Sequence, residues 1–170
     1  MEALLVPLKS MTLVAALGLG LGGCTATITQ ASFFPDAALA PPDAVLEAPP
    51  GYTATNQFFD LGELGKVRAV RLDNPDSETA IIYHAGNASF VDSIGISRTA
   101  ASLASATGAD IILYDYPGRG GTTVPATIAA VTALGPAMAV QMKAAGWVGR
   151  GPVYALSLIH ISEPTRQAEI

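Results

Sequence analysis

The residues of this chain that could do chemistry gather in two short stretches, Tyr83–Phe90 (YHAGNASF) and Tyr114–Thr123 (YDYPGRGGTT). Each combines glycine with polar side chains directly after an apolar run. Within the second stretch, Gly118-Arg119-Gly120 matches the start of the dinucleotide-binding pattern G-x-G-x-x-G. Position 123, however, is threonine where this pattern requires glycine. No acidic residue ends the next strand candidate, so a nucleotide site is not predicted.

Other cofactor and partner classes are also disfavoured. The chain has no G-x-x-x-x-G-K-[ST] phosphate loop. Its two histidines, His84 and His160, have no carboxylate cluster beside them, so we expect neither a metal nor another cofactor. The net charge of −5 and the absence of a basic cluster argue against nucleic acid as a partner.

The elements that must position the two stretches are readable from hydrophobic spacing. The chain has 170 residues, half of them hydrophobic, which suits one domain and excludes disorder. Residues 56–64 and 66–75 predict an antiparallel pair, because the second run alternates apolar positions. Residues 79–87 predict a strand buried on both faces. Residues 92–107 predict a helix, capped by Asp92 or Ser93 and stopped by Gly108.

The same motif of a buried strand followed by a helix then repeats. Residues 109–121 contain the next strand and turn, and residues 124–146 predict a helix with Pro125 in its first turn. We expect Pro136 to kink or split this helix. Residues 151–155 open a further buried strand, which makes the order β-β-β-α-β-α-β. That order predicts an α/β fold with a largely parallel centre and with function at the carboxyl ends of the strands. The second helix is expected to bury one face, formed by Ile128, Val131, Met138 and Met142.

Both loops resemble segments of the serine α/β-hydrolases. IIYHAGNASF resembles the strand and "HGNA" loop of that family, and GADIILYDYPGRGGTTVPAT resembles its next strand and "D-Y-x-G-x-G-x-S" turn. One helix separates the two segments, as in the family, and the resemblance covers about Gly51 to Ala155. It implies an incomplete fold, namely the N-terminal half of an α/β-hydrolase sheet.

The resemblance also implies roles for loop residues. In the family the first loop gives one backbone N–H to the oxyanion hole, which stabilises the charge that develops on a tetrahedral intermediate. An alanine is inserted here, giving His-Ala-Gly-Asn, so Asn87 is the best candidate donor and Ala88 the next. Four residues are expected to shape the loops and not to be catalytic: His84, Gly86, Asp115 and Gly118.

The last stretch departs from the family pattern. The strand at 151–155 should lead into a nucleophile elbow, G-x-S-x-G, but Ser157 has leucine on both sides. LSLIHISEPTR, residues 156–166, resembles a translation of the transposon end used to build sequencing libraries. We therefore interpret residues 156–170 as an adapter-derived artefact. No catalytic residue is assigned, and the nucleophile, acid and base are expected beyond the chain.

The N-terminal sequence predicts the cellular location of the protein. Lys9, an apolar run at 11–21 and the sequence LGGC form a signal-peptide pattern whose end resembles the lipobox of bacterial lipoproteins. This resemblance implies a signal peptide at 1–24 and lipidation of Cys24, which would hold the protein on a membrane. Thr25, not aspartate, follows, which favours the periplasmic face of the outer membrane. Residues 25–50 are interpreted as a flexible tether and 51–155 as the partial domain.

The functional hypothesis is a fragment, itself inactive, of a lipid-anchored serine hydrolase of the bacterial cell envelope. The full-length parent would hydrolyse an ester, thioester or amide bond of a small acyl substrate. The alternative is a non-catalytic envelope lipoprotein that keeps the fold without the elbow. A third hypothesis treats residues 156–170 as genuine and the chain as a small binding domain. The sequence that follows Ala155 in the intact gene discriminates between these hypotheses.

Overall fold

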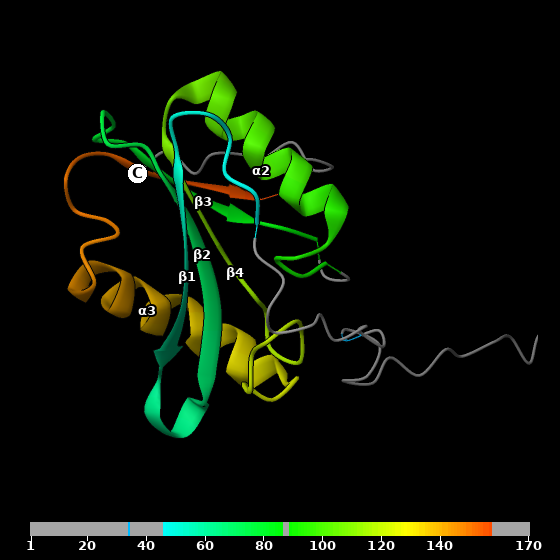
Figure 1. The fold of residues 1–170 in the computed structure, drawn as a ribbon. Helices are drawn as coiled ribbons and strands as arrows, with labels where there is room; N and C mark the ends of the chain where they lie inside the picture. Colours follow the sequence, from blue (N-terminus) through cyan, green and yellow to red (C-terminus); the bar gives the residue numbers. More distant parts are fainter. Residues whose placement is uncertain (1–33, 35–45, 87–88, 158–170) are drawn as a thin grey trace, which may run out of the picture.

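The structure is a computed structural model that describes Phe34, residues 46–86 and residues 89–157 (Figure 1). The predicted signal peptide with Cys24, and the tether up to residue 45 apart from Phe34, lie outside the described residues. The element order agrees with the predicted β-β-β-α-β-α-β series, which confirms the α/β fold class. The elements are β1 (Thr53–Asp60), the short 3-10 helix η2 (Gly62–Leu64), β2 (Lys66–Asp73), β3 (Ala80–His84), α2 (Ile94–Thr107), β4 (Asp110–Tyr114), α3 (Ile128–Ala144) and β5 (Val153–Ser157).

The described strands form one mixed sheet in the order β1-β2-β4-β3-β5. β1 pairs with β2 in antiparallel fashion, as the alternating pattern predicted, and β2 pairs antiparallel with β4. β3 lies between β4 and β5 and is parallel to both. The chain therefore crosses over twice, through α2 and through α3, to build the parallel part of the sheet.

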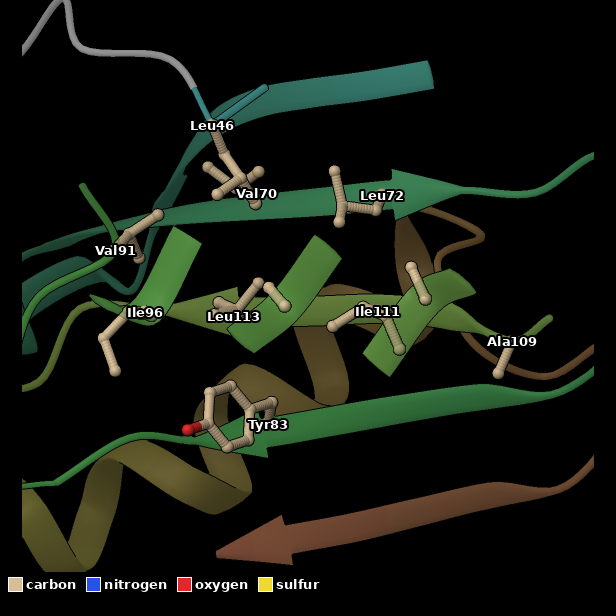
Figure 2. Packing of buried hydrophobic residues seen from close by; sticks show 11 residues of the cluster. Leu46, Val70, Leu72, Tyr83, Val91, Ile96, Ala109, Ile111 and Leu113 are labelled. Atoms are coloured by element: carbon tan, nitrogen blue, oxygen red, sulfur yellow. The ribbon is translucent and has the colours of Figure 1, made fainter. Parts of the chain in front are cut away.

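The two helices cover opposite faces of the sheet (Figure 1). Successive strand residues point to opposite faces, so the strands of the middle of the sheet supply both cores. Val70 and Leu113 pack towards α2, and Ala69 and Ile112 pack towards α3. Figure 2 shows the α2 side, where Leu46, from the segment before β1, packs over Val70. The packed part of the chain thus includes Leu46, within the segment interpreted as a tether.

The helix α2 ends where the sequence predicted. Gly108 adopts a left-handed conformation with φ of 69° and donates its N–H to the carbonyl oxygen of Ala104, which stops the helix. Ser93 occupies the N-cap position, but its side chain makes no capping hydrogen bond. The other predicted cap, Asp92, instead binds Arg68. The helix is held by its buried face, formed by Ile96, Ala100 and Ala104.

The buried face of α3 differs from the prediction in its first half. The helix begins at Ile128, after Pro125, because the Thr127 side chain caps it by accepting the N–H of Ala130. Ile128 and Val131 are exposed, so their assignment to the core was wrong. Nearly every side of α3 is apolar, so the spacing of apolar residues does not fix which side faces the sheet. The buried residues are Ala130, Leu134, Met138 and Met142.

Pro136 does not split α3, which is continuous from Ile128 to Ala144. Proline removes the hydrogen bond that would reach the carbonyl of Thr132, four residues earlier. Both Pro136 and Thr132 are exposed, so water can reach that carbonyl. The prediction that Pro136 splits the helix was therefore wrong, and the alternative, a kink, stays a prediction.

The last described strand, β5, is more exposed than the sequence predicted. It runs from Val153 to Ser157, past the expected end at Ala155, and its residues are exposed or half-buried. Four of its five residues are exposed, so the prediction of a buried strand is wrong. Within the described residues it is the last strand of the sheet and pairs with β3 alone. Its approach is fixed by Arg150, whose guanidinium binds the buried carboxylate of Asp110 at 2.7 Å.

Candidate functional site

The candidate site is formed by the loops that follow β3 and β4. These strands are parallel neighbours, with Ile82 opposite Ile112, so their carboxyl ends lie side by side. The loop after β3 leads from His84 to α2, and the loop after β4 leads from Tyr114 to α3. The topology thus brings together the two stretches that the sequence singled out, at the edge where α/β sheets bind ligands.

An aromatic cluster connects the beginnings of the two loops. The half-buried His84 ring lies edge-on to Tyr114, at 5.4 Å between ring centroids, and stacks with Tyr116 at 6.2 Å. The Nδ1 atom of His84 and the hydroxyl oxygen of Tyr116 are 3.1 Å apart, which is a hydrogen bond whichever partner donates. His84 therefore orients, and is oriented by, the start of the second loop.

The tyrosines of this cluster keep their protons at neutral pH. Burial raises the pKa of Tyr116 to about 12 and also raises the pKa of Tyr114, because a phenolate would lose its hydration there. Tyr116 is thus a neutral hydrogen-bonding partner for His84 and not a base.

Asp115 ties the two loops to each other. Its buried carboxylate accepts the N–H of Val91, in the first loop, at 2.8 Å, and the N–H of Gly121, in the second, at 2.9 Å. This geometry gives Asp115 backbone-holding contacts in both loops. Burial raises the pKa of this carboxyl, while the two N–H donors and the charge of Arg68 act in the opposite direction.

Glycine is required at two positions of the second loop. Gly120 has φ of +51°, and a Cβ atom there would lie 2.1 Å from the Asp115 carboxylate. Gly118 has φ of +69°, and a Cβ atom there would lie 2.7 Å from Cβ of Ala126. In the first loop, by contrast, Gly86 is outside the left-handed region, and an added Cβ would meet only the Ser89 hydroxyl at 3.9 Å.

A buried ion pair that the sequence did not reveal supports the end of the first loop. Arg68 on β2 and Asp92, just before α2, form two hydrogen bonds, one of them 2.9 Å long between Nη2 and Oδ1. Arg68 also donates from Nε to the side-chain oxygen of Asn56 at 3.1 Å. The signal in the sequence was an arginine on an apolar strand face, but its partner lies 24 residues away.

Two of the predicted site residues, the oxyanion candidates Asn87 and Ala88, lie outside the described residues. Ser157 is the last residue of β5 and pairs in register with His84 of β3. Leu156 and Ser157 continue the strand and do not form a sharp turn. His84 contacts Tyr116, and Asp115 accepts backbone N–H groups of both loops, so the contacts described above for these two residues support the loops.

Among the residues that the structure describes, no group of three or more His, Cys, Asp or Glu side chains could hold a metal ion. Within the same part of the chain, no helix has the length and apolarity to cross a membrane.

Comparison with known proteins identifies no family for this chain. No family model matches it, and no curated protein does. Among solved structures, it is similar to alpha/beta hydrolase domain-containing protein 10 from mouse, with 21% identity and a TM-score of 0.41, over 61% of this chain and 39% of the mouse protein.

Two further solved structures have the same TM-score at lower sequence identity. An esterase from Pyrococcus furiosus has 15% identity and a TM-score of 0.41, over 64% of this chain and 41% of the esterase. An esterase/lipase from an uncultured bacterium has 12% identity and a TM-score of 0.41, over 88% of this chain and 48% of that protein. The chain thus spans less than half the length of each of these three proteins.

Proposed function

We propose that this chain is the N-terminal part of a lipid-anchored serine hydrolase of the bacterial cell envelope. The parent protein would cleave an ester, thioester or amide bond of a small acyl substrate, with its nucleophile, acid and base supplied by sequence beyond this chain. The chain itself would supply one backbone N–H of the oxyanion hole, from Asn87 or Ala88, and would be inactive alone.

The observation that carries the proposal is the way Asp115 joins the two loops. An oxyanion donor must be held rigidly, because its benefit depends on not having to reorganise during the reaction. The loop that contains Asn87 and Ala88 starts at His84, which binds Tyr116, and ends near Val91 and Asp92. The second of these ends is held by Asp115 and by Arg68. Both ends of the candidate loop are therefore held, one by the loop that follows β4 and the other by that loop and by β2.

The first experiment reads the source DNA across the codon for Ala155 on long, unfragmented templates. The proposal expects the frame to continue into G-x-S-x-G and then into a distant aspartate and histidine. The continued protein should react with a fluorophosphonate probe at the elbow serine, and the present chain should not. A frame that truly encodes Leu156–Ile170 would refute the hydrolase proposal.

The lipid anchor is tested separately, by the intact mass of the protein made in a Gram-negative host. Cleavage before Cys24 with the added mass of acyl chains supports the anchor, and Cys24→Ser should abolish both. An unmodified chain that starts at Met1 would refute the anchor without affecting the test of the elbow.

A second candidate function is a non-catalytic envelope lipoprotein with the same fold. One observation favours it: β5 continues as a regular strand through Leu156 and Ser157, where a nucleophile elbow would turn sharply. A genuine 156–170 segment in the DNA, with a folded product that the fluorophosphonate probe does not label, would support this function.

A further inference from the structure

The Asp115 carboxylate holds the two loops through different oxygen atoms. Oδ1 accepts the N–H of Val91 at 2.8 Å, and Oδ2 accepts the N–H of Gly121 at 2.9 Å. The residue is 1% exposed, so bulk water does not replace either donor. The backbone of Gly120 packs closely on the carboxylate, since a Cβ atom there would lie 2.1 Å from Oδ2. One carboxylate therefore joins the two loops at this point, with one hydrogen bond to each.

Protonation of Asp115 is incompatible with two such bonds of equal strength. A carboxylate accepts through both oxygens, whereas in a carboxylic acid one oxygen carries the proton and becomes a donor. That oxygen accepts poorly, and here each oxygen faces the N–H of a different loop. A single proton therefore weakens the bond to one of the two loops, whichever oxygen takes it.

The charges around Asp115 only partly favour its ionised form. Arg68 of β2 favours the carboxylate, but Arg68 is itself paired with Asp92, whose negative charge acts in the opposite direction. The second loop buries one more positive charge, Arg119, which acts in the same direction as Arg68. Desolvation is the largest effect, and it raises the pKa of Asp115 above the ordinary value of 3.8.

A raised pKa means that Asp115 is protonated before the protein unfolds in acid. The folded form takes up this proton at a higher pH than the unfolded chain does. The contribution of Asp115 to stability is therefore fully present below the unfolded pKa and is lost as the pH rises through the folded pKa. Protonation of this group consequently does not itself unfold the domain.

The second loop has attachments to β2 that do not involve Asp115. Thr123 donates its N–H to the carbonyl oxygen of Lys66 at 2.8 Å, and the Thr122 hydroxyl donates to the same oxygen at 2.7 Å. These bonds keep the second loop on β2 in either state of the carboxyl. At its Val91 end, the first loop is tied to the second by Asp115. Loss of either bond to the carboxyl thus separates the loops at that end.

We propose that Asp115 is an acid-sensitive clasp, whose protonation uncouples the first loop from the second while the domain stays folded. The proposal goes beyond the proposed function and does not depend on it, because it concerns contacts within this chain alone. Where the proposed function holds, the uncoupled loop is the one that contains the oxyanion candidates Asn87 and Ala88. Acid would then lower the activity of the parent protein, because the donor would no longer be held rigidly.

The test follows three backbone amides of the full chain by NMR hydrogen exchange, as the pH is lowered from neutral. Val91 and Gly121 report the two bonds of the clasp. Gly108 is the control, because its N–H binds the carbonyl oxygen of Ala104 and not a carboxylate. The carbon-13 shift of the Asp115 carboxyl measures its protonation in the same samples. Exchange rates are divided into those of an unstructured chain at each pH, so that the pH dependence of exchange itself cancels.

The proposal expects the protection factor of Val91 or Gly121 to fall about tenfold or more as Asp115 takes up its proton, with Gly108 unchanged. Asp115→Asn has a single oxygen acceptor, so it should reproduce this loss at neutral pH and remove its dependence on acid. Unchanged protection at both reporters after Asp115 is protonated would overturn the proposal. An equal loss at all three amides would also overturn it, because acid would then unfold the whole domain.

Discussion

Removal of one partner from the Arg68–Asp92 ion pair should be among the most damaging single changes in the described domain. The Arg68 side chain is fully buried and that of Asp92 is 4% exposed, so neither charge can turn to water if its partner is lost. Asp92→Asn keeps the shape but removes the negative charge and presents an amide N–H₂ to the guanidinium. Loss of the paired carboxylate costs up to about 3–5 kcal/mol of folding free energy, because the Asp115 carboxylate remains as the other negative charge near Arg68.

A double variant isolates the interaction free energy between Arg68 and Asp92 from the other effects of each substitution. Arg68→Met alone should cost a similar amount, because it leaves the Asp92 carboxylate buried without its counter-charge. Arg68→Met with Asp92→Asn removes both charges, so its cost should fall short of the sum of the single costs by about 2–3 kcal/mol. A control is Asp73→Asn, whose carboxylate is a third exposed and should contribute less than about 1 kcal/mol.

Urea unfolding followed by Trp147 fluorescence is the assay. Trp147 is buried on the α3 side of the sheet, against Phe59 at 5.0 Å between ring centroids, and Arg68 faces the α2 side. A loss of signal therefore reports global unfolding and not a local change beside the ion pair. Single variants that lose less than about 1 kcal/mol, or costs that simply add in the double variant, would refute the reasoning.

Three further predictions concern the loops and the end of the chain. Gly120→Ala should lower the free energy of unfolding by about 2–4 kcal/mol in the same assay, because its Cβ would meet the Asp115 carboxylate. The control Gly95→Ala, in α2, should raise the free energy of unfolding by up to about 1 kcal/mol. Equal effects of the two substitutions would contradict the loop geometry. The pKa of Tyr116 in the folded protein, about 12, lies above the unfolded value of 10, so its contribution to stability is present below pH 10 and is lost as the pH rises from 10 to 12. Absorbance at 295 nm should show a titration component near pH 12 that Tyr116→Phe removes. A titration unchanged by that variant would contradict the burial of Tyr116. The chain as it stands should not hydrolyse p-nitrophenyl esters, and turnover that disappears with Ser157→Ala would show that β5 already carries a nucleophile.

The parts of the fold that depend on local chemistry could be predicted from the sequence. The alternation at 66–73 identified the two faces of β2, and both faces proved to be core. Gly108 predicted the end of α2, because a left-handed residue is needed there and glycine adopts it freely. The order of strands and helices followed from the repeat of an apolar run and a helical pattern.

The parts that depend on distant partners could not be predicted. The buried side of α3 is determined by its packing against the sheet. Because the helix is almost uniformly apolar, the spacing of its hydrophobic residues does not identify that side. The exposure of β5 depends on what packs against its two faces, which its own five residues do not encode. Asp92 has the ideal residue type for a helix cap, but a buried arginine across the sheet competes for its carboxylate.

The position of β4 in the sheet has a consequence for how the protein is made. β1 and β2 are joined by a short connection and can pair as soon as both leave the ribosome. β3 comes next, yet its described partners, β4 and β5, are both synthesised after it. β4 must then insert between β2 and β3. At ordinary rates of translation, β4 is synthesised about 2–7 s after β3. During that interval the apolar strand Ala80–His84 has no described partner strand, and a chaperone that binds extended apolar segments would have its best opportunity there.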